Sequence, residues 1–167
     1  FSNHIAAVAA AGQLFGFSTT GYIRGEAHSP LNPTLQAAQS CGMHLRYLDR
    51  TTYRKRNELE FQQHLLTQHP QSYLIPEGGT NAHALRGCAD LIEELRSQME
   101  HLPDFITLAC GTGGTLAGIA SGLPADSPTL VLGFPVLKGD FMTKNVKTYL
   151  ADWTTSPSGK WAIQEGY

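Results

Sequence analysis

The sequence predicts an α/β protein in which parallel sheets carry helices on both faces. Short apolar runs rich in β-forming residues alternate with helix-forming patterns five times along the chain, which is typical of parallel sheets. Glycine-rich turns follow expected strands, where open α/β sheets bind their ligands. Only 16% of the residues are charged, as expected when many strands are covered on both faces. The 167 residues can form one large domain or two small ones.

Short-range signals place the individual elements. Ser2 and Asn3 can cap a first helix, and Gly12 stands where a helix usually ends. Asn32 followed by Pro33 is typical of the start of a second helix. The expected helices cover residues 5–11, 35–41, 54–68, 85–99 and 116–123. The expected strands cover residues 17–23, 43–48, 72–75 and 105–109, and a last one starts at residue 129.

Three further expectations concern the organisation of the chain. The charges of the helix over residues 54–68 look like a solvated face rather than a binding patch. A weak seam between domains falls at residues 69–71. The alternating pattern fades after residue 136, so we expect residues 152–160 to form a loop.

The chain is organised around the turn at residues 110–115, which reads Cys-Gly-Thr-Gly-Gly-Thr. An expected buried strand precedes this turn and a helical pattern follows it, so the turn lies at the carboxyl end of a parallel strand. Its glycines allow a close approach of the backbone to a ligand. Amides at the start of the helix would point at an anion, most often a phosphate. A glycine-rich turn that binds nothing remains the alternative.

The spacing around this turn excludes two common kinds of phosphate site. A dinucleotide fingerprint needs glycine three residues after Gly113, and Leu116 stands there. A P-loop ends in Gly-Lys-Ser/Thr, and no lysine lies between Lys55 and Lys138. The cradle would therefore consist of backbone and threonine hydroxyls, which suits a cofactor monophosphate better than a nucleoside triphosphate.

Composition argues against several other classes of function. A net charge of −2 without a basic run argues against a nucleic-acid partner, and the absence of an apolar run of about 18 residues argues against a membrane span. Three scattered cysteines form no pair, which fits a reducing cytoplasm. His64 and His69 lack the spacing of a helical metal pair, so we expect no metal site. The serine of residues 118–122 stands one place too late for a hydrolase elbow.

Three stretches in order carry a family resemblance: residues 1–7 (Phe-Ser-Asn-His-Ile-Ala-Ala), 76–81 (Pro-Glu-Gly-Gly-Thr-Asn) and 109–118 (Ala-Cys-Gly-Thr-Gly-Gly-Thr-Leu-Ala-Gly). Together they resemble the 1-aminocyclopropane-1-carboxylate deaminase and D-cysteine desulfhydrase family. These are pyridoxal-phosphate enzymes of the tryptophan-synthase-β fold type. The resemblance implies a smaller α/β domain over residues 1–71 and part of a larger cofactor-binding domain over residues 72–167, with pyridoxal 5'-phosphate between them.

The resemblance also implies roles for matching residues. Ser2 resembles the serine that contacts the substrate carboxylate, a catalytic position that the helix dipole favours. Asn3 is similar to the asparagine that hydrogen-bonds the ring hydroxyl oxygen of the cofactor. His4 stands where deaminases usually carry glutamine and desulfhydrase-like members often histidine, and Thr80 with Asn81 resembles a substrate-side loop. The positions similar to the cofactor-phosphate loop are Gly111, Thr112, Gly113, Gly114 and Thr115.

The chain departs from the family pattern in one important respect. The Schiff-base lysine of the family would precede Phe1, and we interpret the chain as an internal fragment that is inactive by itself. The lysines after the phosphate loop do not match this position and are expected at the surface. The groups that face the pyridine nitrogen would lie near or beyond Tyr167.

The resemblance implies a pyridoxal-phosphate-dependent lyase or deaminase that acts on a small amino acid. Because His4 replaces glutamine, we favour β-elimination from a D-amino acid such as D-cysteine, with release of sulfide, pyruvate and ammonia. Ring opening of 1-aminocyclopropane-1-carboxylate to 2-oxobutanoate and ammonia is the first alternative. A non-catalytic anion-binding α/β module is the second. For the full-length protein we expect a cytoplasmic homodimer with neither a nucleic-acid nor a membrane partner.

Overall fold

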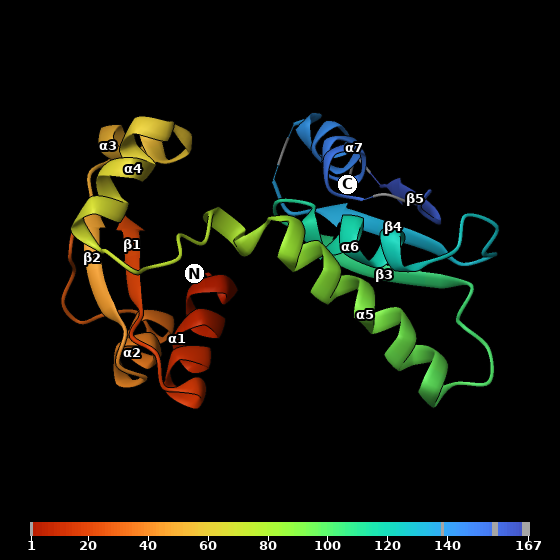
Figure 1. Cartoon of the computed structure of the whole chain (residues 1–167), viewed down its shortest axis with the longest axis horizontal. Coiled ribbons are helices and arrows are strands. Elements are labelled where there is room, and N and C mark those ends of the chain that lie inside the picture. Colours follow the sequence, from red (N-terminus) through yellow and green to blue (C-terminus); the bar gives the residue numbers. More distant parts are fainter. Residues whose placement is uncertain (1, 138, 155–156, 165–167) are drawn as a thin grey trace. The chain divides into compact units, whose positions relative to one another are not determined.

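The computed structural model describes residues 2–137, 139–154 and 157–164 (Figure 1). Contacts between Cα atoms divide the chain into two compact units, Phe1–Leu74 (unit 1) and Ile75–Tyr167 (unit 2). The predicted seam at residues 69–71 lies near this boundary. The assignment of the two parts to a smaller and a larger domain stays a prediction.

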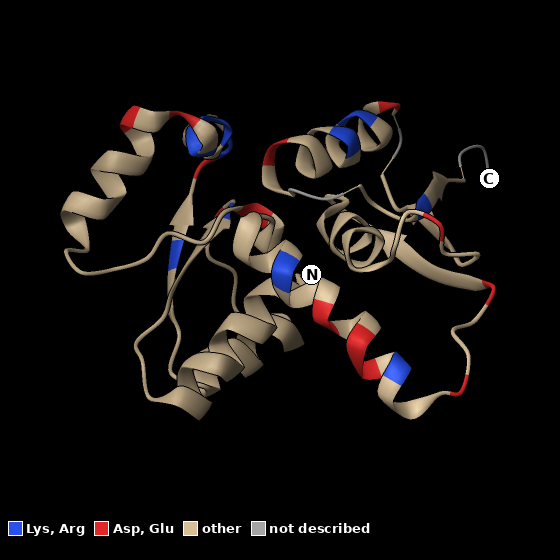
Figure 2. Ribbon diagram, turned by 45° about the vertical axis from the view of Figure 1, so that its right-hand side comes forward, with Lys and Arg blue, Asp and Glu red and all other residues tan. Residues whose placement is uncertain are grey.

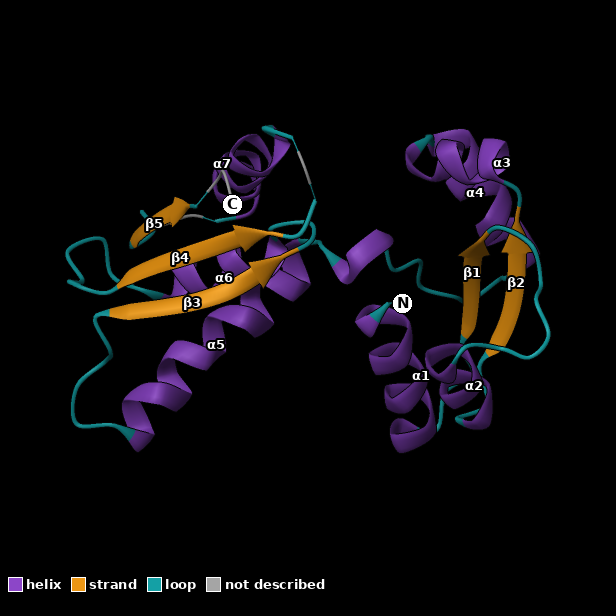
Figure 3. Ribbon diagram, turned by 180° about the vertical axis from the view of Figure 1, so that it is seen from behind, coloured by secondary structure: helices purple, strands orange, loops and turns teal. Residues whose placement is uncertain are grey.

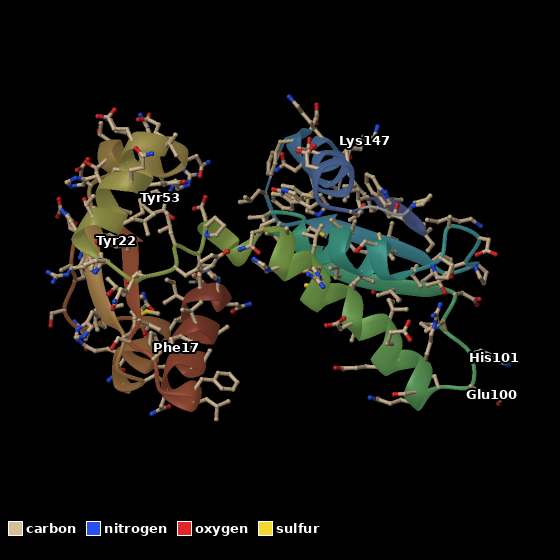
Figure 4. All side chains as sticks on the ribbon, in the orientation of Figure 1. Phe17, Tyr22, Tyr53, Glu100, His101 and Lys147 are labelled. Carbon is tan, nitrogen blue, oxygen red and sulfur yellow. The ribbon has the colours of Figure 1, made fainter. Side chains whose placement is uncertain are left out.

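Unit 1 is built on two parallel strands, β1 (Thr20–Arg24) and β2 (His44–Leu48). Its helices are α1 (Asn3–Phe15), α2 (Pro33–Ser40), α3 (Arg50–Arg54) and α4 (Leu59–Gln68), with the short 3-10 helix η1 (Lys55–Asn57). The small core consists of Ala9, Ala38 and Met43. The hydroxyl oxygen of Tyr22, labelled in Figure 4, lies 2.8 Å from Nε2 of His69 and ties β1 to the end of α4.

Unit 2 contains a parallel sheet of three strands in the order β3-β4-β5. The strands are β3 (Phe105–Cys110), β4 (Leu130–Pro135) and β5 (Lys160–Ile163). The helices are η2 (Glu77–Gly79), α5 (Ala82–Gln98), α6 (Gly114–Gly122) and α7 (Phe141–Trp153). Figures 1 and 3 show α5 and α6 on one face of β3 and β4. On that face Val131 and Leu116 are fully buried.

The two helices on this face approach each other closely because α6 carries a glycine at every fourth residue. Gly114, Gly118 and Gly122 therefore lie along one side of α6. A Cβ atom added at Gly118 would lie 2.4 Å from Cβ of Cys88 and 2.7 Å from the carbonyl oxygen of Leu85, both on α5. These glycines set the distance between α5 and α6.

The predicted fold class is confirmed, because parallel sheets are flanked by helices in an α/β arrangement. The turn between residues 105–109 and 116–123 is also confirmed as a strand–turn–helix unit. Within the described residues no helix is both long and apolar enough to cross a membrane. In the same part of the chain, no three His, Cys, Asp or Glu residues come together as metal ligands would.

Two expectations for unit 1 were wrong in detail. Gly12 does not end the first helix, which continues to Phe15 and is closed by Gly16 at a φ of 75°. Gly12 is instead needed for packing, since a Cβ atom there would lie 2.8 Å from the carbonyl oxygen of Phe17. The single helix over residues 54–68 is in fact α3, η1 and α4. Asp49 starts α3 by accepting from the amide of Thr51 at 2.8 Å.

The charged residues of this broken helix form a solvated face, as predicted. Arg54, Lys55, Glu58 and Glu60 are exposed. Figure 2 shows basic and acidic residues close to one another over α3 and the start of α4. Arg56 instead lies over the ring of Tyr53, with 5.2 Å between its guanidinium carbon and the ring centroid.

One expectation for unit 2 was also wrong, and another was wrong in part. Residues 72–75 form neither a strand nor a helix, and the side chains of Tyr73 and Ile75 are exposed. The alternating pattern fades after residue 136, but this segment contains α7 and β5. The predicted loop at residues 152–160 is confirmed for residues 154 and 157–159, which form no helix or strand. It is wrong only at its ends, because Asp152 lies in α7 and Lys160 begins β5.

Candidate functional site

The turn between β3 and α6 presents backbone amides at the start of a helix. Gly113 is the N-cap of α6 and has a φ of 89°, a conformation that residues with a side chain avoid. The first hydrogen bond along this helix runs from the amide of Ala117 to the carbonyl oxygen of Gly113 at 3.0 Å. The amides of residues 114–116 therefore have no partner within the helix, and a glycine N-cap has no side chain to accept from them. The positive end of the helix dipole lies at the same place.

The turn has an open side and a packed side. Gly111 and Thr115 are exposed, and a Cβ atom at Gly111 would meet nothing within 4 Å. Gly113 is buried, and a Cβ atom there would lie 2.9 Å from both Sδ of Met142 and Cγ2 of Val146 on α7. The side chain that Gly113 lacks would thus point at α7. A ligand would approach from the side of Gly111 and Thr115.

A second loop braces this turn from within unit 2. The hydroxyl oxygens of Thr80 and Thr112 lie 2.5 Å apart and share a hydrogen bond. A Cβ atom at Gly78 would lie 2.6 Å from Cγ2 of Thr112, and one at Gly114 would lie 2.7 Å from Cγ2 of Thr80. Each threonine therefore occupies the space that a glycine of the other loop leaves free. The structure brings Thr80 together with the predicted phosphate loop.

The predicted residues of the first motif lie at the start of α1 in unit 1. Ser2 is the N-cap, and its Oγ accepts a hydrogen bond from the amide of Ile5 at 3.3 Å. Its hydroxyl hydrogen is left for another acceptor. Ser2 and Asn3 are exposed, and Asn3 is the first residue of the helix. Their predicted roles toward substrate and cofactor stay predictions.

His4 is half-buried in the first turn of α1. Burial lowers the pKa of His4 below its ordinary value of 6.5, because a charged ring is poorly solvated there. The ring is therefore neutral at pH 7. A neutral imidazole carries one donor and one acceptor nitrogen.

The remaining residues named in the sequence analysis are a helix cap, Asn81, and the lysines that follow the turn. Asn81 caps α5 by accepting from the amide of Ala84 at 2.9 Å. Lys144, Lys147 and Lys160 are exposed, as predicted, and Figure 4 shows Lys147 on α7. Phe1, Lys138 and Tyr167 lie outside the described residues.

Sequence reasoning missed the part that α7 plays behind the turn. Met142, Val146, Tyr149 and Trp153 recur at helical spacing, which is the signal that could have revealed this helix. The rings of Tyr149 and Trp153 stack with centroids 4.8 Å apart. Burial raises the pKa of Tyr149, so its hydroxyl stays protonated near neutral pH.

A parallel sheet with a glycine-capped helix after its first strand defines an α/β protein with a candidate anion site. Residues 1–157 match the family of pyridoxal-phosphate dependent enzymes, and the chain belongs to this family. The predicted resemblance is thus confirmed, and the cofactor that it implied is the cofactor of the family.

Individual relatives are of two kinds, by sequence and by structure. A bifunctional D-cysteine desulfhydrase/1-aminocyclopropane-1-carboxylate deaminase of Arabidopsis thaliana is 40% identical over 55 residues, 30% of this chain and 14% of that protein. A Thermotoga maritima protein named as a candidate 1-aminocyclopropane-1-carboxylate deaminase is 28% identical over 149 residues, 86% of this chain and 46% of that protein. The crystal structure of an ACC deaminase homologue superposes with a TM-score of 0.78 at 22% identity, covering 97% of this chain and 52% of that one. The chain spans about half the length of the relatives that it matches over most of its own length.

Proposed function

We propose that this chain binds the phosphate of pyridoxal phosphate on residues 111–115. The observation that carries the proposal is the turn after β3, where a glycine N-cap leaves the first amides of α6 without a partner in the helix and where Gly111 and Thr115 are exposed. The residues present fit a monophosphate. Thr112 and Thr115 add hydroxyl donors, Gly111 leaves room for close approach, and no lysine of the kind that a triphosphate site needs is near in sequence.

We further propose that the complete protein is a lyase or deaminase acting on a small amino acid. Pyridoxal phosphate, when bound, withdraws electrons from the carbon that bears the substrate amine. Asn3 would hydrogen-bond the ring hydroxyl oxygen of the cofactor, and Ser2 would donate its free hydroxyl hydrogen to the substrate carboxylate. The start of α1 supports the second role, because its dipole favours a carboxylate.

Within this class, we favour β-elimination from a D-amino acid such as D-cysteine. The support comes from His4, which replaces the glutamine usual in deaminases and is held neutral by burial. The name of the Arabidopsis relative, which includes both activities, is compatible with either substrate. The second candidate is ring opening of 1-aminocyclopropane-1-carboxylate. It is favoured by the name of the Thermotoga relative, which aligns with most of this chain.

Two measurements on the complete protein test these proposals. We expect a visible absorption band to appear when pyridoxal phosphate is added and to disappear on dialysis against hydroxylamine. A protein that binds no cofactor would be the anion-binding module instead. Catalytic efficiency is then compared for D-cysteine and for 1-aminocyclopropane-1-carboxylate. A preference for the cyclopropane substrate would contradict the choice of β-elimination and leave the reaction class standing.

Ser2 needs a test that separates its cap from its contact with substrate. Replacing an N-cap serine by alanine costs about 1 kcal/mol, whereas glycine costs only a few tenths. Ser2→Gly therefore removes the hydroxyl and preserves α1. We expect it to raise KM for the amino acid by about tenfold, the effect of one lost hydrogen bond to a carboxylate. An unchanged KM in Ser2→Gly would leave Ser2 as a cap only.

A further inference from the structure

We propose that Thr80 is a positioning residue of the phosphate loop, and that it acts through the hydroxyl of Thr112 rather than by touching substrate. This inference rests on the proposed function, because it needs the phosphate to lie at residues 111–115. It differs from the role that the family resemblance implies for Thr80. Its basis is the hydrogen bond of 2.5 Å between the two hydroxyls, which joins residues 32 positions apart in sequence.

The side chains of the pair are fixed by packing as well as by this bond. Both threonines are half-buried. The methyl of Thr112 fills the space above Gly78, and the methyl of Thr80 fills the space above Gly114, since a Cβ atom on either glycine would lie within 2.7 Å of it. Neither hydroxyl can turn away without moving a methyl out of its site. The two loops are therefore held in one register.

Thr80 is itself held by the helix that follows it. Asn81 caps α5, so Thr80 is the residue directly before the cap. The position of α5 is set by its close contact with α6 along Gly118 and Gly122, where added Cβ atoms would lie 2.7 Å and 2.6 Å from backbone carbonyl oxygens of α5. Because Thr80 meets α6 at Gly114, it continues the same line of contact up to the phosphate loop. The brace is thus anchored in the core of unit 2.

The number of hydroxyl hydrogens determines which threonine is the donor in the hydrogen bond of the pair once an anion is bound. Each threonine hydroxyl has one hydrogen to donate and two lone pairs to accept. Either oxygen can be the donor in the hydrogen bond between them. A phosphate oxygen can only accept, so Thr112 donates to it only if Thr80 donates to Thr112. Thr80 would then orient the Thr112 hydroxyl toward the anion and strengthen its bond through cooperativity.

The test is a double-mutant cycle on the full chain with pyridoxal phosphate and inorganic phosphate as probes. Thr80→Val keeps the shape of the side chain and removes the hydroxyl, and Thr112→Val does the same on the other side. We expect each single variant to lower the affinity for either probe by about tenfold, or about 1.4 kcal/mol. In the Thr112→Val background, Thr80→Val should have no further effect, because Thr80 acts through Thr112.

Three comparisons make the result decisive. Thr80→Ser, which keeps the hydroxyl, should restore affinity to within about threefold of the wild type. Thr107→Val, on an exposed threonine of β3, is the matched control and should leave affinity unchanged. Hydrogen exchange of the amides of residues 112–116 without ligand should be faster in Thr80→Val than in the wild type, and this readout needs no activity.

The outcomes separate the inference from the proposed function. A wild-type chain that binds neither probe would contradict the proposed function. A wild type that binds while Thr80→Val keeps full affinity and normal exchange would overturn the role of Thr80. So would additive effects of the two substitutions. A rise in KM for the amino acid with unchanged cofactor affinity would mean that Thr80 contacts substrate instead.

Discussion

Replacing Gly118 by alanine should destabilise unit 2, although alanine is the better helix former. In a helix interior, alanine is favoured over glycine by about 1 kcal/mol. The added Cβ atom would lie 2.4 Å from Cβ of Cys88 and 2.7 Å from the carbonyl oxygen of Leu85. A backbone oxygen cannot move as a rotamer does, so α5 must shift away from α6. Overpacking of this kind costs about 3 kcal/mol, at the upper end of its usual range, which leaves a net loss of about 2 kcal/mol.

The matched control for Gly118→Ala is Gly87→Ala on the neighbouring helix. Gly87 lies away from both ends of α5 and is exposed, and a Cβ atom there would meet nothing within 4 Å. Here alanine should stabilise the protein by about 0.5–1 kcal/mol through helix propensity alone. The two substitutions are chemically identical and differ only in what the new methyl meets. Their difference, about 3 kcal/mol, therefore isolates the packing of α5 on α6.

Urea unfolding followed by tryptophan fluorescence measures both variants. The chain has two tryptophans, Trp153 and Trp161, and both pack against the core of unit 2, so the signal reports this unit alone. With an m-value of about 2 kcal/mol/M, Gly118→Ala should lower the midpoint by about 1 M. It should also weaken phosphate binding, because α5 carries Thr80 away from Thr112. A midpoint equal to or above that of Gly87→Ala would refute the packing argument.

Two further predictions concern the turn and the start of α1. Gly113→Val should abolish cofactor retention and also lower the midpoint of urea unfolding of unit 2, since its side chain would meet α7 at a φ that valine avoids. In Gly111→Val the new side chain faces open space, so cofactor binding should weaken while the midpoint of urea unfolding stays unchanged. Full cofactor content in Gly113→Val would argue against the phosphate site. Because burial lowers the pKa of His4, the unfolded chain takes up its proton first as the pH falls below 6.5. The stability of unit 1 should then decrease as the pH falls and level off below the pKa of His4 in the folded state. His4→Gln should remove this part of the pH dependence, which hydrogen exchange in α1 measures. An equal pH dependence in both proteins would contradict the prediction.

Local sequence signals predicted the strand–turn–helix unit of unit 2 and failed where contacts between distant residues decide the structure. The strand–turn–helix around residues 110–115 follows from β-formers, glycines and helical spacing, all of which act locally. Tyr73 and Ile75 have the same β-forming character, yet their segment forms no strand. A strand needs a neighbour in register, and that information is not local. Gly12 was mistaken for a helix end because closeness to Phe17 is invisible in sequence.

The site shows the same division between local and non-local information. The residues proposed to hold a phosphate could be chosen from the sequence, since glycine and threonine at the start of a helix favour an anion by their chemistry alone. The brace between Thr80 and Thr112 could not, because it depends on the distance between α5 and α6. The spacing of Gly114, Gly118 and Gly122 was nevertheless present in the sequence. It indicated close packing on one side of α6 but not which helix packs there.

The fit of the two loops explains why the motifs at residues 76–81 and 109–118 are informative together. Thr112 needs a glycine at position 78, and Thr80 needs a glycine at position 114, because each methyl occupies the place of the missing Cβ atom. Either glycine-rich loop by itself is a common turn. A loop of one kind without the other would lose both the packing and the hydrogen bond that fix the hydroxyl of Thr112. The two motifs therefore form one structural unit, and the shape of the turn at residues 110–115 depends on the loop before α5 as much as on its own glycines.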